Sequence, residues 1–239
     1  MLHKTDDGIY TSTLLSSIGG LKHGFTTRAH GDMRDEKIIT SFLGNDMVIV
    51  QAQQVHGGSI QTIASKIIKN CVIKGVDGLV ALSGQNELFL AVRTADCVPI
   101  LAIDPLKRII GVAHSGWKGT VAKIPQHLVI EMVAAGADVK NIRVVLGPSI
   151  GVCCYNVKTD HVESFVDAFG SAAKGLIDRG GNFFLDLEEN IGDQLLHVGI
   201  LQFHLEMADM CNATLYPEFF SYRKDSTRTF GEMIGFIGY

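Results

Sequence analysis

The sequence predicts a single layered domain of the α/β (α+β) class, in which a mixed β-sheet is flanked by helices. Short β-like runs punctuated by Gly, Asp and Pro dominate the first half of the chain, and helical patterns come later. The strands do not alternate regularly with helices, so a doubly wound fold is not expected. The composition, 46% hydrophobic and 19% charged, can supply a substantial core.

The expected strands are short apolar runs bounded by turn-forming residues. In the first half they cover 9–15, 47–52, 59–63, 88–92, 99–103 and 109–114, and a later one covers 142–147. A helix over 126–135 follows Pro125, which suits a first helical position, and should stop at Gly136.

Two further helices are expected in the second half. The helix over 161–169 places apolar side chains on one face, with Asp160 and Glu163 expected to cap its start. The helix over 187–198 should begin after Asp186, which is a good capping residue. No repeat or low-complexity linker divides the chain, so one domain over 1–239 is expected.

Charge and hydropathy narrow the function classes. The net charge is −4 and Lys/Arg runs do not exceed two residues, so a nucleic-acid partner is not expected. No apolar run approaches the roughly 18 residues of a membrane span, and the first residues carry charges where a signal peptide would be apolar. We expect a cytoplasmic protein that does not bind membranes; its oligomeric state stays open.

The five cysteines do not form a predicted disulfide framework. Their number is odd and no secretion signal is evident, so reduced, mostly buried thiols are expected.

A predicted hairpin over 99–114 brings one of these thiols to a histidine. If the turn is centred between Leu106 and Lys107, Cys97 faces Gly116 and Pro99 faces His114. Diagonal neighbours on one face lie about 7–8 Å apart, so Cys97 and His114 would converge. A register error of one residue would separate them.

A second histidine, His56, lies where the strand from Met47 gives way to Gly57-Gly58. Two His and one Cys make a three-ligand catalytic zinc set. Two alternatives stay open at this point: a buried cysteine beside two hydrogen-bonded histidines, and a Cys97 thiolate nucleophile with His114 as its base.

Two neighbouring features each have a functional and a simpler structural interpretation. The stretch "GPSIG" matches the nucleophile elbow around Ser149, but no helical pattern follows, so a glycine-rich turn is favoured. Asp96 would reach a metal at Cys97 only if the chain bends there; capping a backbone turn or orienting a ligand is the favoured role.

Seven motifs together resemble one family. "GFTTR", "QVHGGSI", "TADCVPILAIDP", "GVAHSGWKG", "LGPSIGVCCYNV", "LDL" and "FFSYRKD" run in order along nearly the whole chain. They resemble the YfiH family, whose members are labelled laccase-like polyphenol oxidoreductases, purine nucleoside phosphorylases and peptidoglycan editing factors. The resemblance implies metal ligands and catalytic residues at His56, Cys97 and His114, with zinc, or copper in some members.

The resemblance also implies substrate contacts. Arg28 and Arg223 fall on family arginines, and a guanidinium suits phosphate; a structural ion pair is the alternative for each. The segment after Arg28 is shorter than in the family, Asn156 replaces the usual Glu, and nearby His30 is expected to be uninvolved.

The leading hypothesis is a zinc-dependent purine nucleoside enzyme with a nucleoside and phosphate as partners. The resemblance implies phosphorolysis of adenosine, inosine, guanosine and methylthioadenosine, and deamination of adenosine. Zinc would supply hydroxide for attack at C6 of adenosine. The chain has no His-x-His pair, so a multinuclear copper oxidase is not expected. The alternatives are a hydrolase that removes a wrong amino acid from a muropeptide nucleotide, a copper-dependent polyphenol oxidase, and a metal-stabilised binding protein.

Overall fold

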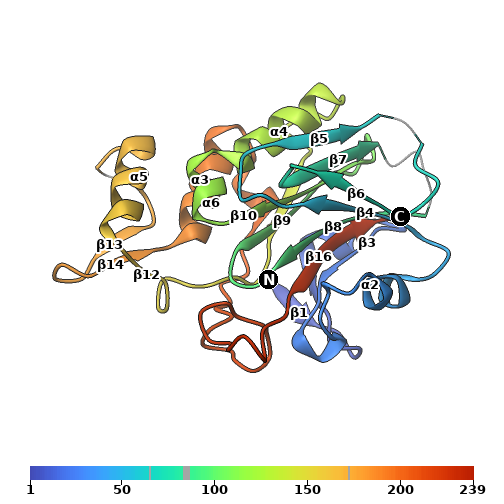
Figure 1. Cartoon of the computed structure of the whole chain (residues 1–239). Coiled ribbons are helices and arrows are strands. Elements are labelled where there is room, and N and C mark those ends of the chain that lie inside the picture. The colour runs from blue at the N-terminus through green and yellow to red at the C-terminus, as the bar shows by residue number, and fades with distance from the viewer. Residues whose placement is uncertain (65, 83–86, 172) are drawn as a thin grey trace.

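Two β-sheets stacked face to face form the centre of the computed structural model, which describes residues 1–64, 66–82, 87–171 and 173–239. Helices α3, α4 and α6 cover one side, and α2 covers the other (Figure 1). Both sheets contain parallel and antiparallel pairs. The result is a mixed α/β single domain, which confirms the predicted fold class.

The strands in the described part of the chain form three sheets. The seven-stranded sheet has the order β1 (Leu2–Lys4), β2 (Tyr10–Ser12), β3 (Lys22–Phe25), β16 (Met233–Gly238), β8 (Leu88–Thr94), β4 (Val48–Gln53) and β6 (Cys71–Lys74). The six-stranded sheet has the order β15 (Leu205–Glu206), β11 (Arg143–Leu146), β9 (Val98–Asp104), β10 (Ile109–Ser115), β7 (Gly78–Leu82) and β5 (Ile60–Ile63). The small sheet has the order β12 (Asn156–Val157), β14 (Phe183–Leu185) and β13 (Leu176–Asp178).

The helices are mostly short. They are α1 (Thr13–Ser16), η1 (Arg28–His30), α2 (Glu36–Leu43), α3 (Trp117–Val121), α4 (Ile124–Ala134), α5 (Thr159–Phe169), α6 (Leu187–His197) and η2 (Gln202–His204). No helix in the described ranges is both long and apolar enough to cross a bilayer.

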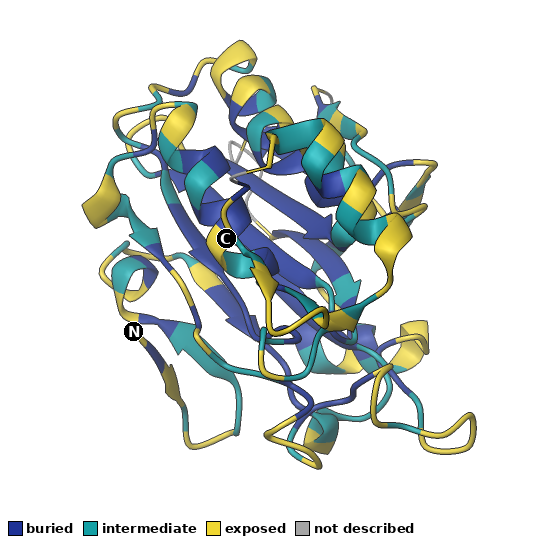
Figure 2. Cartoon of the chain, turned by 90° about the vertical axis from the view of Figure 1, so that its left-hand side faces the viewer, coloured by how far each residue is buried: buried dark blue, intermediate teal, exposed yellow. Residues whose placement is uncertain are grey.

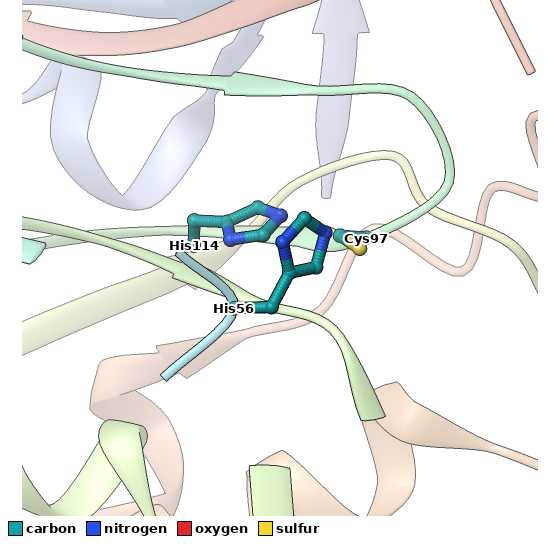
Figure 3. Close-up of side chains that lie close together, drawn as sticks. All are labelled: His56, Cys97 and His114. Carbon is teal, nitrogen blue, oxygen red and sulfur yellow. The ribbon is translucent and has the colours of Figure 1, made fainter. Parts of the chain in front are cut away.

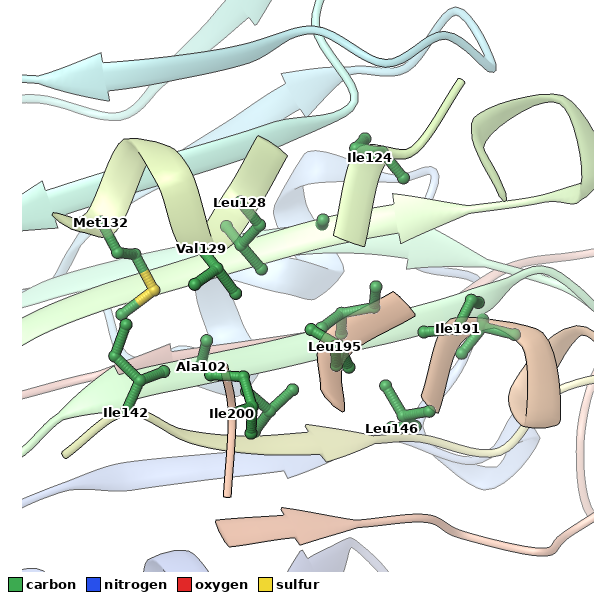
Figure 4. Close-up of a cluster of buried hydrophobic side chains, with 14 of the residues drawn as sticks. Ala102, Ile124, Leu128, Val129, Met132, Ile142, Leu146, Ile191, Leu195 and Ile200 are labelled. Carbon is green, nitrogen blue, oxygen red and sulfur yellow. The ribbon is translucent and has the colours of Figure 1, made fainter. Parts of the chain in front are cut away.

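Successive side chains of the central strands pack into different hydrophobic layers on the two faces of each sheet. In β9, Ile100 faces the cluster under α4 and α6, whereas Leu101 faces the other sheet. In β8, Leu90 faces that same space between the sheets and Phe89 faces α2. Because successive side chains point to opposite faces, strands buried on both faces are apolar throughout. Figure 4 shows the cluster under α4 and α6, and Figure 2 shows the buried strands beneath helices with exposed outer faces.

Most predicted elements are present. The strands over 47–52, 59–63, 88–92, 99–103, 109–114 and 142–147 correspond to β4, β5, β8, β9, β10 and β11, and the three predicted helices correspond to α4, α5 and α6. Asp186 caps α6, because its side chain accepts a hydrogen bond from the Glu189 N–H at 3.0 Å.

Two local predictions were wrong. The strand over 9–15 ends at Ser12, whose side chain caps α1 by accepting a hydrogen bond from the Leu15 N–H. Helix α5 begins earlier than expected, with Lys158 at the N-cap and no side-chain cap bond; Asp160 therefore lies inside the first turn. Ser12 could continue a strand or cap a helix, and Asp160 could cap a helix or lie in its first turn. The sequence alone does not separate these roles, because short polar side chains can bond to the backbone in either position.

The hairpin register is the predicted one. Pro99 pairs with His114 and Asp104 pairs with Ile109. Asp104 is fully buried, and its side chain accepts hydrogen bonds from the Leu106 and Lys107 N–H groups at 2.9 and 3.0 Å. This turn fixes the register, so Cys97 and His114 meet at the open end of the hairpin.

Buried His23 makes folding stability depend on pH. Its Nε2 accepts a hydrogen bond from the Ser12 N–H at 3.0 Å, and burial lowers the pKa of His23 to about 4. An unfolded histidine titrates near 6.5, so the unfolded state binds more protons between pH 6.5 and 4, and stability falls as the pH falls through this window. We expect at most about 3 kcal/mol of this loss to come from His23. Denaturant unfolding of His23→Gln should show a shallower pH slope; an unchanged slope would contradict the assignment.

Candidate metal centre

Three side chains from separate strand ends point toward one another (Figure 3). His56 follows β4, Cys97 precedes β9 and His114 lies near the end of β10. Their candidate ligand atoms, one from each residue, all lie within 4.8 Å of one another. His56 is exposed, Cys97 is partly exposed and His114 is buried, so one side of the group is accessible to solvent and the other is enclosed by protein.

Asp77 holds two of these residues in place. Its fully buried carboxylate accepts hydrogen bonds from the N–H groups of Val55, His56 and Gly57 at 3.1, 2.9 and 2.7 Å. His56 has a φ of 60°, which is uncommon for a residue other than glycine. The three N–H bonds stabilise this backbone and thereby orient the His56 side chain.

The same carboxylate is 3.0 Å from Nδ1 of His114. Although burial opposes its ionisation, hydrogen bonds from His114, Gly57 and Val55 lower the pKa of Asp77. A carboxylate on Nδ1 directs Nε2 toward a metal, as in many histidine sites. Asp77 was not among the predicted site residues; the signal available in the sequence is an acidic residue inside the apolar run "GVDGLVAL".

The electrostatics favour a thiolate at Cys97. Burial opposes its ionisation, but His114 and His56 together lower the pKa of Cys97 to about 7. Burial also disfavours charge on His114, while Cys97 and Asp77 raise the pKa of His114 to about 9. A thiolate beside two imidazoles, one of them backed by a carboxylate, fits a divalent metal such as zinc.

Gly116 leaves room for the Cys97 sulfur. A Cβ atom at this position would lie 2.7 Å from Sγ of Cys97, which is a steric clash. We therefore expect Gly116→Ala to displace the thiol and weaken metal binding by about tenfold or more, the scale seen when groups around ligands are disturbed. Chelator competition measures this affinity. Gly57→Ala is the matched control, because its nearest contact is 3.6 Å; equal affinities in the two variants would contradict the steric argument.

A cavity of about 580 Å³ lies over the three residues. Aromatic rings form much of its wall, with the Trp117 and His161 rings 4.4 Å apart. The lining residues are Gln54, His56, Arg93, Thr94, Ala95, Asp96, Cys97, His114, Gly116, Trp117, Ile150, Tyr155, His161, Leu187, Tyr222, Arg223, Phe230 and Glu232. This volume suits a small organic ligand.

Asp96 lines the cavity and also caps a turn. The chain bends there with a φ of 88°, and Oδ2 accepts hydrogen bonds from the Ser221 hydroxyl at 3.1 Å and the Arg223 N–H at 2.7 Å. The favoured turn-capping role is therefore present. Its other oxygen, Oδ1, is buried without a hydrogen-bond partner, and burial raises the pKa of Asp96.

The two arginines occupy different environments. Arg223 lines the cavity, where its guanidinium donates to the carbonyls of Cys154 at 2.8 Å and Asn156 at 3.3 Å. Arg28 is not among the lining residues. Its guanidinium forms an ion pair with Asp225 at 2.7 Å and donates to the carbonyls of Pro217, Phe219 and Thr229. This arrangement favours the structural alternative for Arg28.

Arg28→Lys tests that role. Lysine keeps the charge but cannot reach several acceptors with a planar fork, so the segment over 217–229 should loosen. We expect a loss of about 1–3 kcal/mol in unfolding free energy, and phosphate-dependent and phosphate-independent turnover should fall together. A loss confined to the phosphate-dependent reaction would instead indicate that Arg28 binds phosphate.

Three other residues lie away from the ligand set. Ser149 is buried, its N–H bonds to the Met210 carbonyl, and no helix follows it, as a nucleophile elbow would require. His30 bonds within its own turn to Thr27. Lys118 lies near the Trp117 ring, 5.6 Å from its centroid.

Comparisons with known proteins agree with the fold. The family model described as "Multi-copper polyphenol oxidoreductase laccase" matches residues 22–239. The purine nucleoside phosphorylase YlmD of Geobacillus stearothermophilus is 34% identical over 198 residues, which are 79% of this chain and 71% of the relative. The adenosine deaminase RL5, from an unknown prokaryotic organism, is 31% identical over 193 residues, or 76% and 73% of the two chains.

Solved structures show the same architecture. The crystal structure of YfiH from Bacillus licheniformis superposes with a TM-score of 0.84 at 28% identity, covering 99% of this chain and 98% of that one. YlmD from Geobacillus stearothermophilus superposes with a TM-score of 0.82 at 26% identity, with the same coverage. The chain therefore belongs to the laccase-like YfiH family of multi-copper polyphenol oxidoreductase homologues.

Proposed function

We propose that the chain is a metal-dependent purine nucleoside enzyme, acting over residues 1–239 as one catalytic unit. It would carry out phosphorolysis of adenosine, inosine, guanosine and methylthioadenosine, and deamination of adenosine. The observation that carries this proposal is the set of two histidines and one cysteine opening onto an aromatic-walled cavity. Relatives named as purine nucleoside phosphorylase and adenosine deaminase support it.

His56, Cys97 and His114 are the proposed ligands. Two imidazoles and one thiolate suit zinc, while three protein ligands are typical of catalytic rather than structural zinc sites. When bound, zinc supplies Lewis acidity and makes hydroxide available near neutral pH. Copper is the alternative ion, since imidazole and thiolate ligands also suit it. Asp77 would keep His114 oriented with either metal.

The cavity walls suit a purine nucleoside. Trp117 and Tyr155 offer aromatic surface to a flat base, and the volume of about 580 Å³ accommodates a small organic ligand. We propose that the carboxyl group of Asp96, which lines the cavity, exchanges a proton with the bound base or its departing group. The Arg223 guanidinium, which lies 5.5 Å from the Tyr155 ring centroid, is the proposed anion contact.

An assay panel tests the proposal. The zinc-loaded protein is incubated with adenosine, with and without phosphate, and chromatography separates adenine from inosine. We expect inosine in both conditions, and adenine only with phosphate, where part of the inosine is also converted to hypoxanthine. A serine-bearing muropeptide nucleotide and a catechol, the latter with copper-loaded protein, test the alternative activities. Turnover of either one without nucleoside turnover would overturn the proposal.

A further inference from the structure

Three cysteines outside the cavity form a second cluster of candidate ligands. Cys153 and Cys154 lie in the turn after β11, and Cys211 lies in the segment after β15. Their sulfur atoms all lie within 4.8 Å of one another. None of the three lines the cavity, and the cluster is therefore separate from the candidate metal centre.

The backbone brings these thiols together independently of any bond between them. The Ser149 N–H donates to the Met210 carbonyl at 3.1 Å, and the Asn212 N–H donates to the Ser149 carbonyl at 2.8 Å. The two segments therefore run side by side. The N–H groups of Cys154 and Tyr155 both donate to the Gly151 carbonyl at 3.0 Å, and this turn returns the adjacent cysteines toward Cys211.

Backbone donors surround the Cys211 sulfur. The N–H groups of Gly151 and Thr214 both donate hydrogen bonds to it. Such N–H donors commonly support thiolate ligands, as outer groups do around other metal ligands. Cys153 is exposed and the other two are partly exposed, so an ion can reach the sulfurs from solvent.

We propose that Cys153, Cys154 and Cys211 bind one thiophilic d¹⁰ cation, Zn²⁺ or Cu⁺. A ligand set of thiolates alone selects these soft or borderline ions. Sulfurs at about 2.3 Å from one ion lie roughly 4 Å from one another, which is compatible with the present separations. Binding replaces three S–H bonds by three sulfur–metal bonds and releases the protons to solvent. A disulfide between two of the cysteines would leave the third sulfur unused.

A cation bound to these cysteines would stabilise one wall of the cavity. Tyr155 follows Cys154 directly, and the Arg223 guanidinium donates to the Cys154 carbonyl at 2.8 Å. An ion held by both segments would fix these two lining residues without touching a substrate. The cation therefore has a structural role, and the proposal stands whether or not the cavity binds a purine nucleoside.

Metal stoichiometry tests the site. Reduced full-length protein is loaded with Zn²⁺, freed of excess by gel filtration and measured by elemental analysis. We expect about two ions per chain in wild type and about one in Cys153→Ser/Cys211→Ser, since the other site keeps its ligands. His56→Ala/Cys97→Ala should also hold about one, while Cys71→Ser, a cysteine of β6 outside both clusters, should hold about two.

Two further measurements identify the ion and guard against misfolding. Cobalt substitution should give thiolate-to-cobalt absorption that falls in the double cysteine variant to the level of the single Cys97 thiolate. Titration with Cu⁺ against a chromophoric chelator compares the two ions. The single variant Cys153→Ser, at an exposed side chain, should weaken binding at this site by about tenfold or more. Equal metal in wild type and the folded variants would overturn the proposal, as would a disulfide formed in place of metal uptake by reduced protein.

Discussion

Replacing Cys97 by Ala is expected to remove the metal from the candidate centre and to reduce purine nucleoside turnover by about a thousandfold or more. The thiolate is the only anionic ligand among the three, and two imidazoles alone bind zinc more weakly. His56 and His114 lie beside the sulfur, so its loss leaves no neighbouring group in the described cluster to replace it. Elemental analysis and the adenosine assay measure the two effects.

The control for this experiment is Cys71→Ala. Cys71 lies on β6 and belongs to neither cysteine-containing cluster, so its replacement should leave metal content and turnover near wild type. If Cys97→Ala instead kept its metal but lost activity, Cys97 would be a free nucleophile with His114 as its base. The pair of measurements thus separates a metal-ligand role of Cys97 from a role as a free nucleophile.

The convergence of Cys97 and His114 could be predicted because it depends on local chemistry. The Asp104 side chain bonds to the Leu106 and Lys107 N–H groups, and this turn sets the strand register. Register then decides which side chains share a face. A hairpin therefore encodes its own pairing within a short stretch of sequence, and Pro99 lies opposite His114 as expected.

Long-range pairing was not predictable in the same way. Strand β16 lies between β3 and β8, whose residues are far away in the sequence, and nothing in its apolar sequence MIGFIG indicates which strands it pairs with. The two-sheet arrangement depends on such pairings. Asp77 was missed for a related reason, because its four hydrogen-bond donors come from Val55, His56, Gly57 and His114, which only the fold brings together.

Arg28 shows the limit of motif arguments. From the sequence, the arginine after "TT" could contact phosphate or form a structural ion pair. In the structure its guanidinium donates to Asp225 and to carbonyls of the segment over 217–229. Arg223, by contrast, lines the cavity. The difference lies in which acceptors the fold places nearby, and no local pattern around either arginine reports it.

Asp77→Asn is expected to lower metal affinity by about 10–100-fold, the usual effect of removing a carboxylate behind a histidine ligand. The amide has one acceptor oxygen, and its NH₂ group would face an N–H donor that the carboxylate now accepts. Either the loop that carries His56 or the Nδ1 contact of His114 must then lose a hydrogen bond. Both changes misplace a ligand, and the unfolding free energy should fall as well, by about 1–3 kcal/mol per unsatisfied group.

The matched control is Asp104→Asn at the other end of the same hairpin. Asp104 is also fully buried and accepts three backbone hydrogen bonds, from Leu106, Lys107 and Asp138. Its amide should lower stability to a similar degree while leaving metal affinity unchanged. In the folded protein the backbone pairs from Ile103–Ile110 to Val98–Ser115 hold the register without the Asp104 side chain, so Cys97 and His114 stay together. Chelator competition and denaturant unfolding on both variants separate the two effects. Equal metal affinity in Asp77→Asn and wild type would show that His114 binds metal without help from this carboxylate.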